Sequence, residues 1–177
     1  MTAPAAPASR PPLAQLALGD FEHELATTRR VLERVPDVHW DFKPHPRSMS
    51  IGQLAAHLSN IPRWGVLTLG GSEFDVAAGP ARQQHPPATR DAVLATFDAH
   101  VAEARAALTG ADDAHLGGTY TVRNGDRVLT AMPRAAMLRA MILSHIIHHR
   151  GQLSVYLRLL DVPVPSIYGP SADEGGM

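Results

Sequence analysis

Residues 144–165 read SHIIHHRGQLSVYLRLLDVPVP and place three histidines within five positions of a run that otherwise favours a buried helix. Residues four apart on an α-helix lie one above the other, with about 6 Å between their Cβ atoms. His145 and His149 have this spacing, and they continue an apolar stripe that runs from Leu138 through Met141 and Ile142. We therefore expect a last helix, from near residue 133 to about residue 160, that directs two imidazoles into the core.

Two inward imidazoles are costly to bury unless their nitrogens are satisfied. A single inward histidine is usually a core residue with a hydrogen bond, but a pair at this spacing is as often a metal site. A firm divalent site needs a third ligand. His57 lies three residues after Leu54 and four before Ile61, on the inward face of an earlier helix. Three inward histidines from two helices suit zinc, nickel or ferrous iron, with a position open for water or substrate.

The remainder of the chain predicts three more helices. Apolar residues recur at helical spacing from residue 13 to residue 35, and Pro36 ends that pattern. Ser50 and Gln53 form a capping-box signature that opens a second helix, which Pro62 is expected to kink or end unless it continues to residue 69. A third helix runs from a capping Thr89 to a glycine at position 110.

A short segment before the last helix has a different pattern. The sequence TYTVRNGDRVLT, residues 119–130, contains two β-type runs around Asn124 and Gly125, which is the strongest short hairpin signal. The expected fold is all-α, a four-helix bundle with a small β-hairpin packed on it before the last helix. We expect residues 1–11 to form a disordered lead, residues 12–170 the bundle domain, and residues 171–177 a flexible tail.

Composition excludes several classes of function. The chain of 177 residues has sixteen basic and seventeen acidic side chains. It therefore lacks the excess of positive charge that is typical of proteins that bind nucleic acid. No cysteine is present, which rules out a disulfide scaffold, a thiolate metal site and a cysteine nucleophile. No signal-type segment and no run of eighteen uncharged apolar residues occur, so we expect no membrane span and a cytoplasmic protein.

Three stretches of the chain resemble the DinB/YfiT-like superfamily of bacterial damage-inducible four-helix proteins. They are SMSIGQLAAHLSNIPRW around His57, VLTAMPRAAML between hairpin and helix, and SHIIHHRGQLSVYLRLLDVPVPSIYG in the last helix and its exit. The last stretch is the most specific, and the likeness spans residues 13 to 169.

The resemblance implies an up-down-down-up bundle that holds a divalent metal ion with three histidines. Carried over residue by residue, the ligands fall on His57, His145 and His149, the same set that faces inward. Characterised relatives are thiol-dependent enzymes, such as bacillithiol transferases and mycothiol-dependent maleylpyruvate isomerase, and many others have no assigned activity. Relatives of this kind also imply a homodimer and a role in stress response. Fold and site carry over better than reaction does.

Five other side chains are candidates for roles near the site, each with an alternative. Arg150 binds a carboxylate of a thiol cosubstrate or makes a structural ion pair. Gln152 orients a ligand imidazole or packs. His148, about 100° around the helix from the inward pair, is a proton shuttle or an exposed histidine. Trp64 and Tyr168 wall a pocket or belong to the core.

Two functions from different classes fit these features, with an inert helical domain as a third reading. The first is a metal-dependent S-transferase that activates a low-molecular-weight thiol of the bacillithiol type for attack on an electrophile, with a metal-dependent hydrolase as its close variant. The second is a non-enzymatic, metal-binding stress-response protein whose metal is structural or a sensor. An open ligand position favours the first function, and a closed coordination sphere favours the second.

Overall fold

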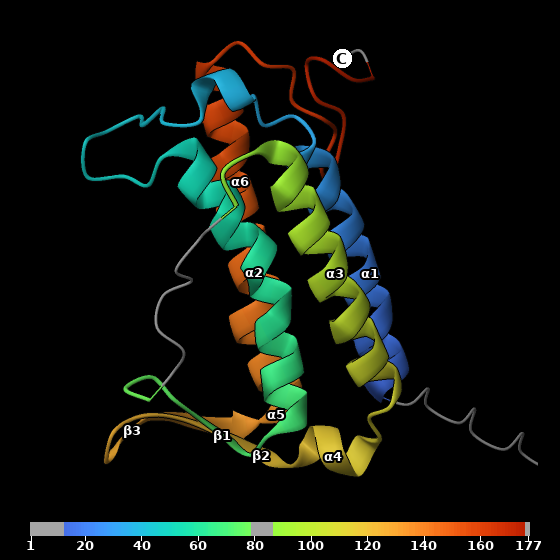
Figure 1. Cartoon of the computed structure of the whole chain (residues 1–177). Coiled ribbons are helices and arrows are strands. Elements are labelled where there is room, and N and C mark those ends of the chain that lie inside the picture. The colour runs from blue at the N-terminus through green and yellow to red at the C-terminus, as the bar shows by residue number, and fades with distance from the viewer. Residues whose placement is uncertain (1–12, 79–86, 176–177) are drawn as a thin grey trace, which may run out of the picture.

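The computed structural model describes residues 13–78 and 87–175, and most of them are helical (Figure 1). The expected lead, residues 1–11, lies outside the described ranges. The helical elements are α1 (Leu13–Leu32), η1 (Asp37–His39), α2 (Ile51–Gly70), α3 (Arg90–Thr109), α4 (Asp113–Gly117), α5 (Arg134–Met137), η2 (Leu138–Leu143) and α6 (Ser144–Leu159). The strands are β1 (Glu73–Asp75), β2 (Thr119–Asn124) and β3 (Arg127–Pro133).

The long helices enclose one hydrophobic core. Helix α2 packs on α3 and α6, and α1 packs on the same two helices from the other side. Figure 1 shows α1 and α6 running in one direction and α2 and α3 in the other. Leucine, isoleucine, valine and phenylalanine side chains from all four fill the space between them, including Leu25, Leu58, Phe97 and Leu153. Within the described ranges, no helix is both long and apolar enough to cross a membrane.

Helix α2, which carries His57, begins and continues for identifiable reasons. The Ser50 side chain accepts the Gln53 backbone N–H and the Gln53 side chain accepts that of Ser50, so the predicted capping box is confirmed. Pro62 lies inside the helix but does not end it. The Nδ1 atom of His100 in α3 lies 2.9 Å from the Ser59 carbonyl oxygen and hydrogen-bonds it. A side chain from α3 thus bonds a backbone acceptor of α2 in the turn before the proline.

The first turn of α2 is also fixed by an aromatic side chain. Trp40 packs so closely on Gly52 that a Cβ there would come within 2.3 Å of the indole ring. Only glycine allows this approach. The contact anchors the connection between α1 and α2, and thereby sets where α2 enters the core.

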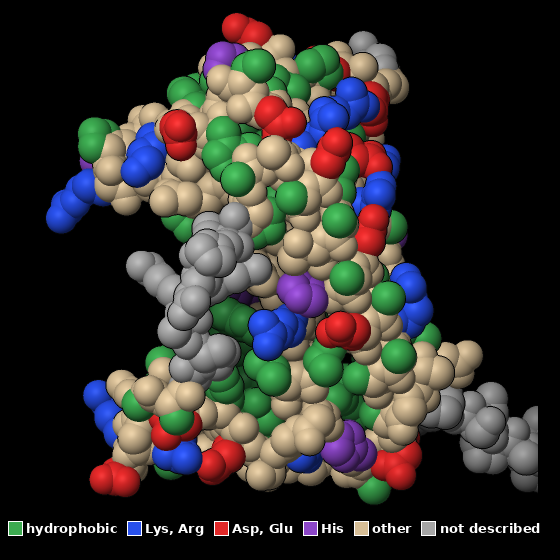
Figure 2. All heavy atoms as spheres, viewed as in Figure 1, with side chains coloured by type: hydrophobic (Ala, Val, Ile, Leu, Met, Phe, Trp, Pro, Cys, Tyr) green, Lys and Arg blue, Asp and Glu red, His purple; other side chains and the backbone are tan. Residues whose placement is uncertain are grey.

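The expected hairpin is present, but it belongs to a larger sheet. Strands β2 and β3 pair antiparallel around Gly125, whose φ of +58° suits the turn. The short strand β1 adds to β2 in parallel, giving the order β1-β2-β3. The all-α prediction missed this strand, because three residues give no readable alternation. Arg123 of β2 forms ion pairs with Glu73 and Asp75 of β1 and so stabilises the pairing. Figure 2 shows the surface hollowed between this sheet and the upper part of the molecule.

The last helical stretch changes its winding before it reaches the histidines. Residues Leu138–Leu143 form a π-helix, and the Ser144 N–H bonds the Arg139 carbonyl, five residues back. The wider turn shifts the buried stripe by one position, so that Ile142 is buried and Met141 is 38 % exposed. Of the two neighbouring positions assigned to the stripe, Ile142 therefore faces the core and Met141 does not.

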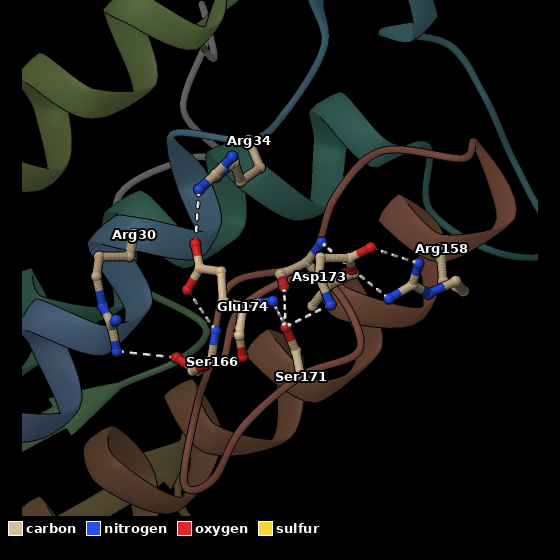
Figure 3. Close-up of polar contacts among 8 residues, drawn as sticks. Arg30, Arg34, Arg158, Ser166, Ser171, Asp173 and Glu174 are labelled. Carbon is tan, nitrogen blue, oxygen red and sulfur yellow. Dashed lines mark hydrogen bonds and ion pairs between the residues drawn. The ribbon is translucent and has the colours of Figure 1, made fainter. Parts of the chain in front are cut away.

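The segment after α6 is tied to two helices through charged side chains (Figure 3). The Asp173 carboxylate accepts the Val164 backbone N–H at 2.9 Å and pairs with Arg158 of α6. Glu174 accepts the Ser166 N–H and pairs at 2.8 Å with Arg34, two residues after the end of α1. Asp173 and Glu174, assigned from the sequence to a flexible tail, thus make several defined contacts.

Candidate metal centre

Three histidine side chains from two helices meet at one point. His57 lies in the second turn of α2, and His145 and His149 occupy successive turns of α6. The Nε2 atom of His145 is 3.2 Å from that of His57 and 2.8 Å from that of His149. The rings of His57 and His149 stand perpendicular, with centroids 4.6 Å apart. His149 is buried and the other two are half-buried.

The outer nitrogen of one ring indicates where its proton lies. His149 Nδ1 is 2.7 Å from the Gln152 carbonyl oxygen Oε1, which can only accept a hydrogen bond. The neutral His149 ring therefore carries its proton on Nδ1 and turns the lone pair of Nε2 toward His145, 2.8 Å away. Burial lowers the pKa of His145, and a hydrogen bond with the Met141 backbone opposes that shift.

The electrostatics of the cluster keep the rings neutral. Burial, followed by repulsion from His149 and His145, lowers the pKa of His57 from 6.5 to about 4. Burial is also the largest cause that lowers the pKa values of His145 and His149. At neutral pH the cluster therefore presents unprotonated imidazoles, the form that binds metal ions.

The donor set fits a divalent metal ion. One nitrogen from each ring lies within 4.8 Å of the other two, in the part of the chain that the structure describes. In a tetrahedral site with metal–nitrogen bonds of about 2.0–2.1 Å, ligand nitrogens lie about 3.3 Å apart, close to the His57–His145 separation. Gln152 and the Met141 backbone supply the outer hydrogen bonds that metal-binding imidazoles usually have.

One of the proposed pocket aromatics lies at the cluster. The Trp64 ring centroid is 5.5 Å from that of His145 and 6.2 Å, edge-on, from that of His57. Trp64 follows His57 by seven residues, two turns along the same face of α2. Its side chain is 37 % exposed, so it flanks the histidines without closing over them.

Arg150 is committed to a buried network of its own. Its guanidinium, 1 % exposed, pairs with Glu24 at 2.8 Å and donates to the Tyr168 hydroxyl at 2.6 Å. It also bonds Thr28 and the Glu24 carbonyl, and the Tyr168 hydroxyl donates to the Glu24 carboxylate. Of the two roles considered, the structural ion pair is the one seen. Tyr168 accordingly lies against Arg150 and His23 in this network.

The other candidates divide between the site and the surface. Gln152 bonds His149 directly, as an orienting residue would. His148 is exposed, with its ring centroid 4.8 Å from that of His149. The hydrogen bond between His145 and the Met141 backbone was not predicted, because a backbone group has no side-chain signature. Glu24 was also missed, because its ion pair with Arg150 joins α1 to α6 and no pattern within either helix indicates it.

Comparisons with known proteins agree with this architecture. The family model of the DinB superfamily matches residues 20–153. The chain is 25 % identical over 157 residues to an uncharacterised Bacillus subtilis protein, YrdA, covering 89 % of each chain.

Two solved structures share the fold at low sequence identity. A DinB-like protein from Bacillus cereus ATCC 10987 superposes with a TM-score of 0.69 at 20 % identity, covering 87 % of this chain and 97 % of that one. A DinB-like protein from Bacillus subtilis gives a TM-score of 0.68 at 18 % identity, covering 87 % and 99 %. With the family model spanning most of its length, this chain belongs to the DinB superfamily.

Proposed function

We propose that this protein is a divalent-metal-dependent thiol S-transferase, with His57, His145 and His149 as the metal ligands. The observation that carries the proposal is the convergence of three imidazole nitrogens from two helices, each within 4.8 Å of the other two, which is a donor set that a divalent cation binds. The proposed ion is zinc, nickel or ferrous iron, all of which imidazole ligands suit.

The charge of the donor set supports chemistry on an anion. All three proposed ligands are neutral imidazoles. Among the described residues, the group of side chains that could hold a metal ion contains no carboxylate. A divalent ion held there keeps its full charge, so it lowers the pKa of a coordinating thiol towards neutral pH. With three protein ligands, a tetrahedral ion has one position left for the sulfur.

The proposed reaction needs no cysteine from the chain. The thiol of a low-molecular-weight cosubstrate, of the bacillithiol type, loses its proton to solvent and attacks an electrophilic carbon. A carbon–sulfur bond forms, the bond to the leaving group breaks, and its electron pair departs with that group. Gln152 holds the His149 ring in the tautomer that faces inward. Trp64 shields one side of the histidine cluster from water.

A rate measurement with a chelator control tests this proposal. The purified protein, loaded with zinc, is mixed with cysteine and chlorodinitrobenzene, and the thioether is followed by its absorbance. We expect a rate above the background reaction that is lost on chelation and in His57→Ala. The exposed neighbour supplies the matched control, because His148→Ala should retain the rate. A rate that survives both chelation and His57→Ala would contradict the proposal.

A non-enzymatic metal-binding role is the second candidate. Its favouring observation is the burial of His149, the most enclosed of the three rings, which suits a stable structural site. Metal content of one ion per chain with no thiol transfer would support it. Hydrolysis of an activated ester instead would indicate the hydrolase variant.

The remaining expectations belong to the same proposal. The directions of the long helices in Figure 1 support assignment to the up-down-down-up four-helix bundle. We also propose a cytoplasmic homodimer that acts in stress response, which sedimentation of the purified protein and its abundance after DNA damage would test.

A further inference from the structure

The surroundings of the histidine cluster differ in polarity along the helices. On α6, Gln152 lies one turn after His149, is exposed, and hydrogen-bonds the His149 ring. In the opposite direction the neighbours are apolar. Trp64 and Leu67 of α2 are each 37 % exposed, and Met141, one turn before His145, is 38 % exposed. One end of the cluster therefore offers hydrogen-bonding groups, and the other offers an apolar surface.

Trp64 is the central element of the apolar end. Its indole contacts two of the three histidine rings, which hold it at a defined distance from the cluster. More than a third of its side chain still reaches the surface, although large aromatic side chains gain most from burial. An indole fixed on one side and open on the other is suited to stacking on a flat partner.

We propose that Trp64, flanked by Leu67 and Met141, is the binding subsite for an aromatic or flat apolar group on the electrophilic substrate. This inference rests on the proposed transferase function and names the class of its second substrate. The polar thiol cosubstrate would then occupy the end near Gln152. Such an arrangement brings an apolar electrophile and a polar thiol to the histidines from opposite directions.

A comparison of two electrophiles tests the subsite. With cysteine as the thiol, chlorodinitrobenzene carries a flat ring and iodoacetamide does not. In Trp64→Ala we expect KM for chlorodinitrobenzene to rise roughly tenfold, as loss of aromatic stacking predicts, with the iodoacetamide reaction changed less than about twofold. Trp64→Phe should recover most of the loss. Val38→Ala, which removes another exposed apolar side chain, is the matched control.

Metal content, measured in each variant, separates the subsite from a packing role. If Trp64 only supports the histidine rings, Trp64→Ala will lose metal, and the reaction rates with the two electrophiles will fall equally. That result would overturn the proposal. Equal KM values for wild type and Trp64→Ala with chlorodinitrobenzene would overturn it as well.

A binding measurement keeps the inference testable if no transfer reaction is found. In a Trp40→Phe background Trp64 is the sole tryptophan, because the chain contains two. We expect unreactive 1,3-dinitrobenzene to quench Trp64 fluorescence saturably in the zinc-loaded protein, and cyclohexanol to compete weakly. Quenching that rises linearly, without saturation, in a folded variant would show that Trp64 has no such site, whatever the catalytic outcome.

Discussion

His149 and Arg150 are consecutive in the chain and both are buried, yet the two side chains lie in opposite kinds of environment. Around Arg150, every charge meets a partner, because Glu24 and Tyr168 bond the guanidinium and each other. Around His149, by contrast, one nitrogen from each of three imidazole rings lies within 4.8 Å of the other two.

The difference shows how a buried polar residue can be interpreted. A paired charge such as Arg150 is satisfied within the fold, so its network accounts for its burial. Three converging imidazole nitrogens also have the arrangement that binds a metal ion, so they point to a ligand. Burial alone does not distinguish these two cases, whereas the polar partners around each side chain do.

The largest expected effect removes one converging nitrogen. In His57→Ala we expect the metal content to fall from about one ion per chain to near zero, because two imidazoles make a weak divalent site. Elemental analysis after loading and desalting measures this. His148→Ala, adjacent on α6 but exposed, should keep its ion. If both variants retain equal metal, His57 is not a ligand.

Replacing Arg150 should affect folding and leave the metal site in place. Arg150→Met leaves the Glu24 carboxylate buried without its partner, so we expect a loss of about 3–5 kcal/mol in the free energy of unfolding. Urea denaturation measures it. Adding Glu24→Gln should recover much of the loss, since both charges are then gone. Arg158→Met removes an exposed ion pair and should cost less than about 1 kcal/mol. Similar losses in the two arginine variants would contradict the contrast between the buried network and the exposed pair.

Gln152 tests the hydrogen bond that orients a ligand. Gln152→Leu removes the acceptor of the His149 Nδ1 proton, and we expect zinc affinity to fall by about 10–100-fold. Competition with a chromogenic chelator gives the affinity. Gln152→Glu keeps an acceptor and should bind at least as well as the wild type. An unchanged affinity in Gln152→Leu would mean that the side chain only packs.

A separate effect is the pH dependence of the metal-free protein. The pKa of His57 is about 4 when folded and 6.5 ordinarily, so the folded chain binds fewer protons between these values. Stability is then complete above pH 6.5 and declines as the pH falls towards 4. We expect Tm to drop by about 2–4 °C for each ~1 kcal/mol lost, as followed by circular dichroism. His57→Leu should show a shallower decline, and an identical slope would refute this origin.

Local signals predicted most of the helical elements. The capping box at Ser50 and the hairpin at Asn124 and Gly125 are confirmed, because each depends on residues within a few positions of one another. Strand β1 was missed because its hydrogen-bond partner, β2, lies some fifty residues away. The π-helix was missed as well, since apolar residues fit an α-helical or a π-helical stripe almost equally.

The sequence by itself determined the helical pattern, the family and the inward direction of His57, His145 and His149, because helix periodicity fixes which side chains share a face. Tertiary structure alone decided that the rings meet at hydrogen-bond distance and that Arg150 pairs with Glu24. The first contact depends on how α2 packs on α6, and the second depends on how α1 packs on α6. No pattern along one helix contains that information.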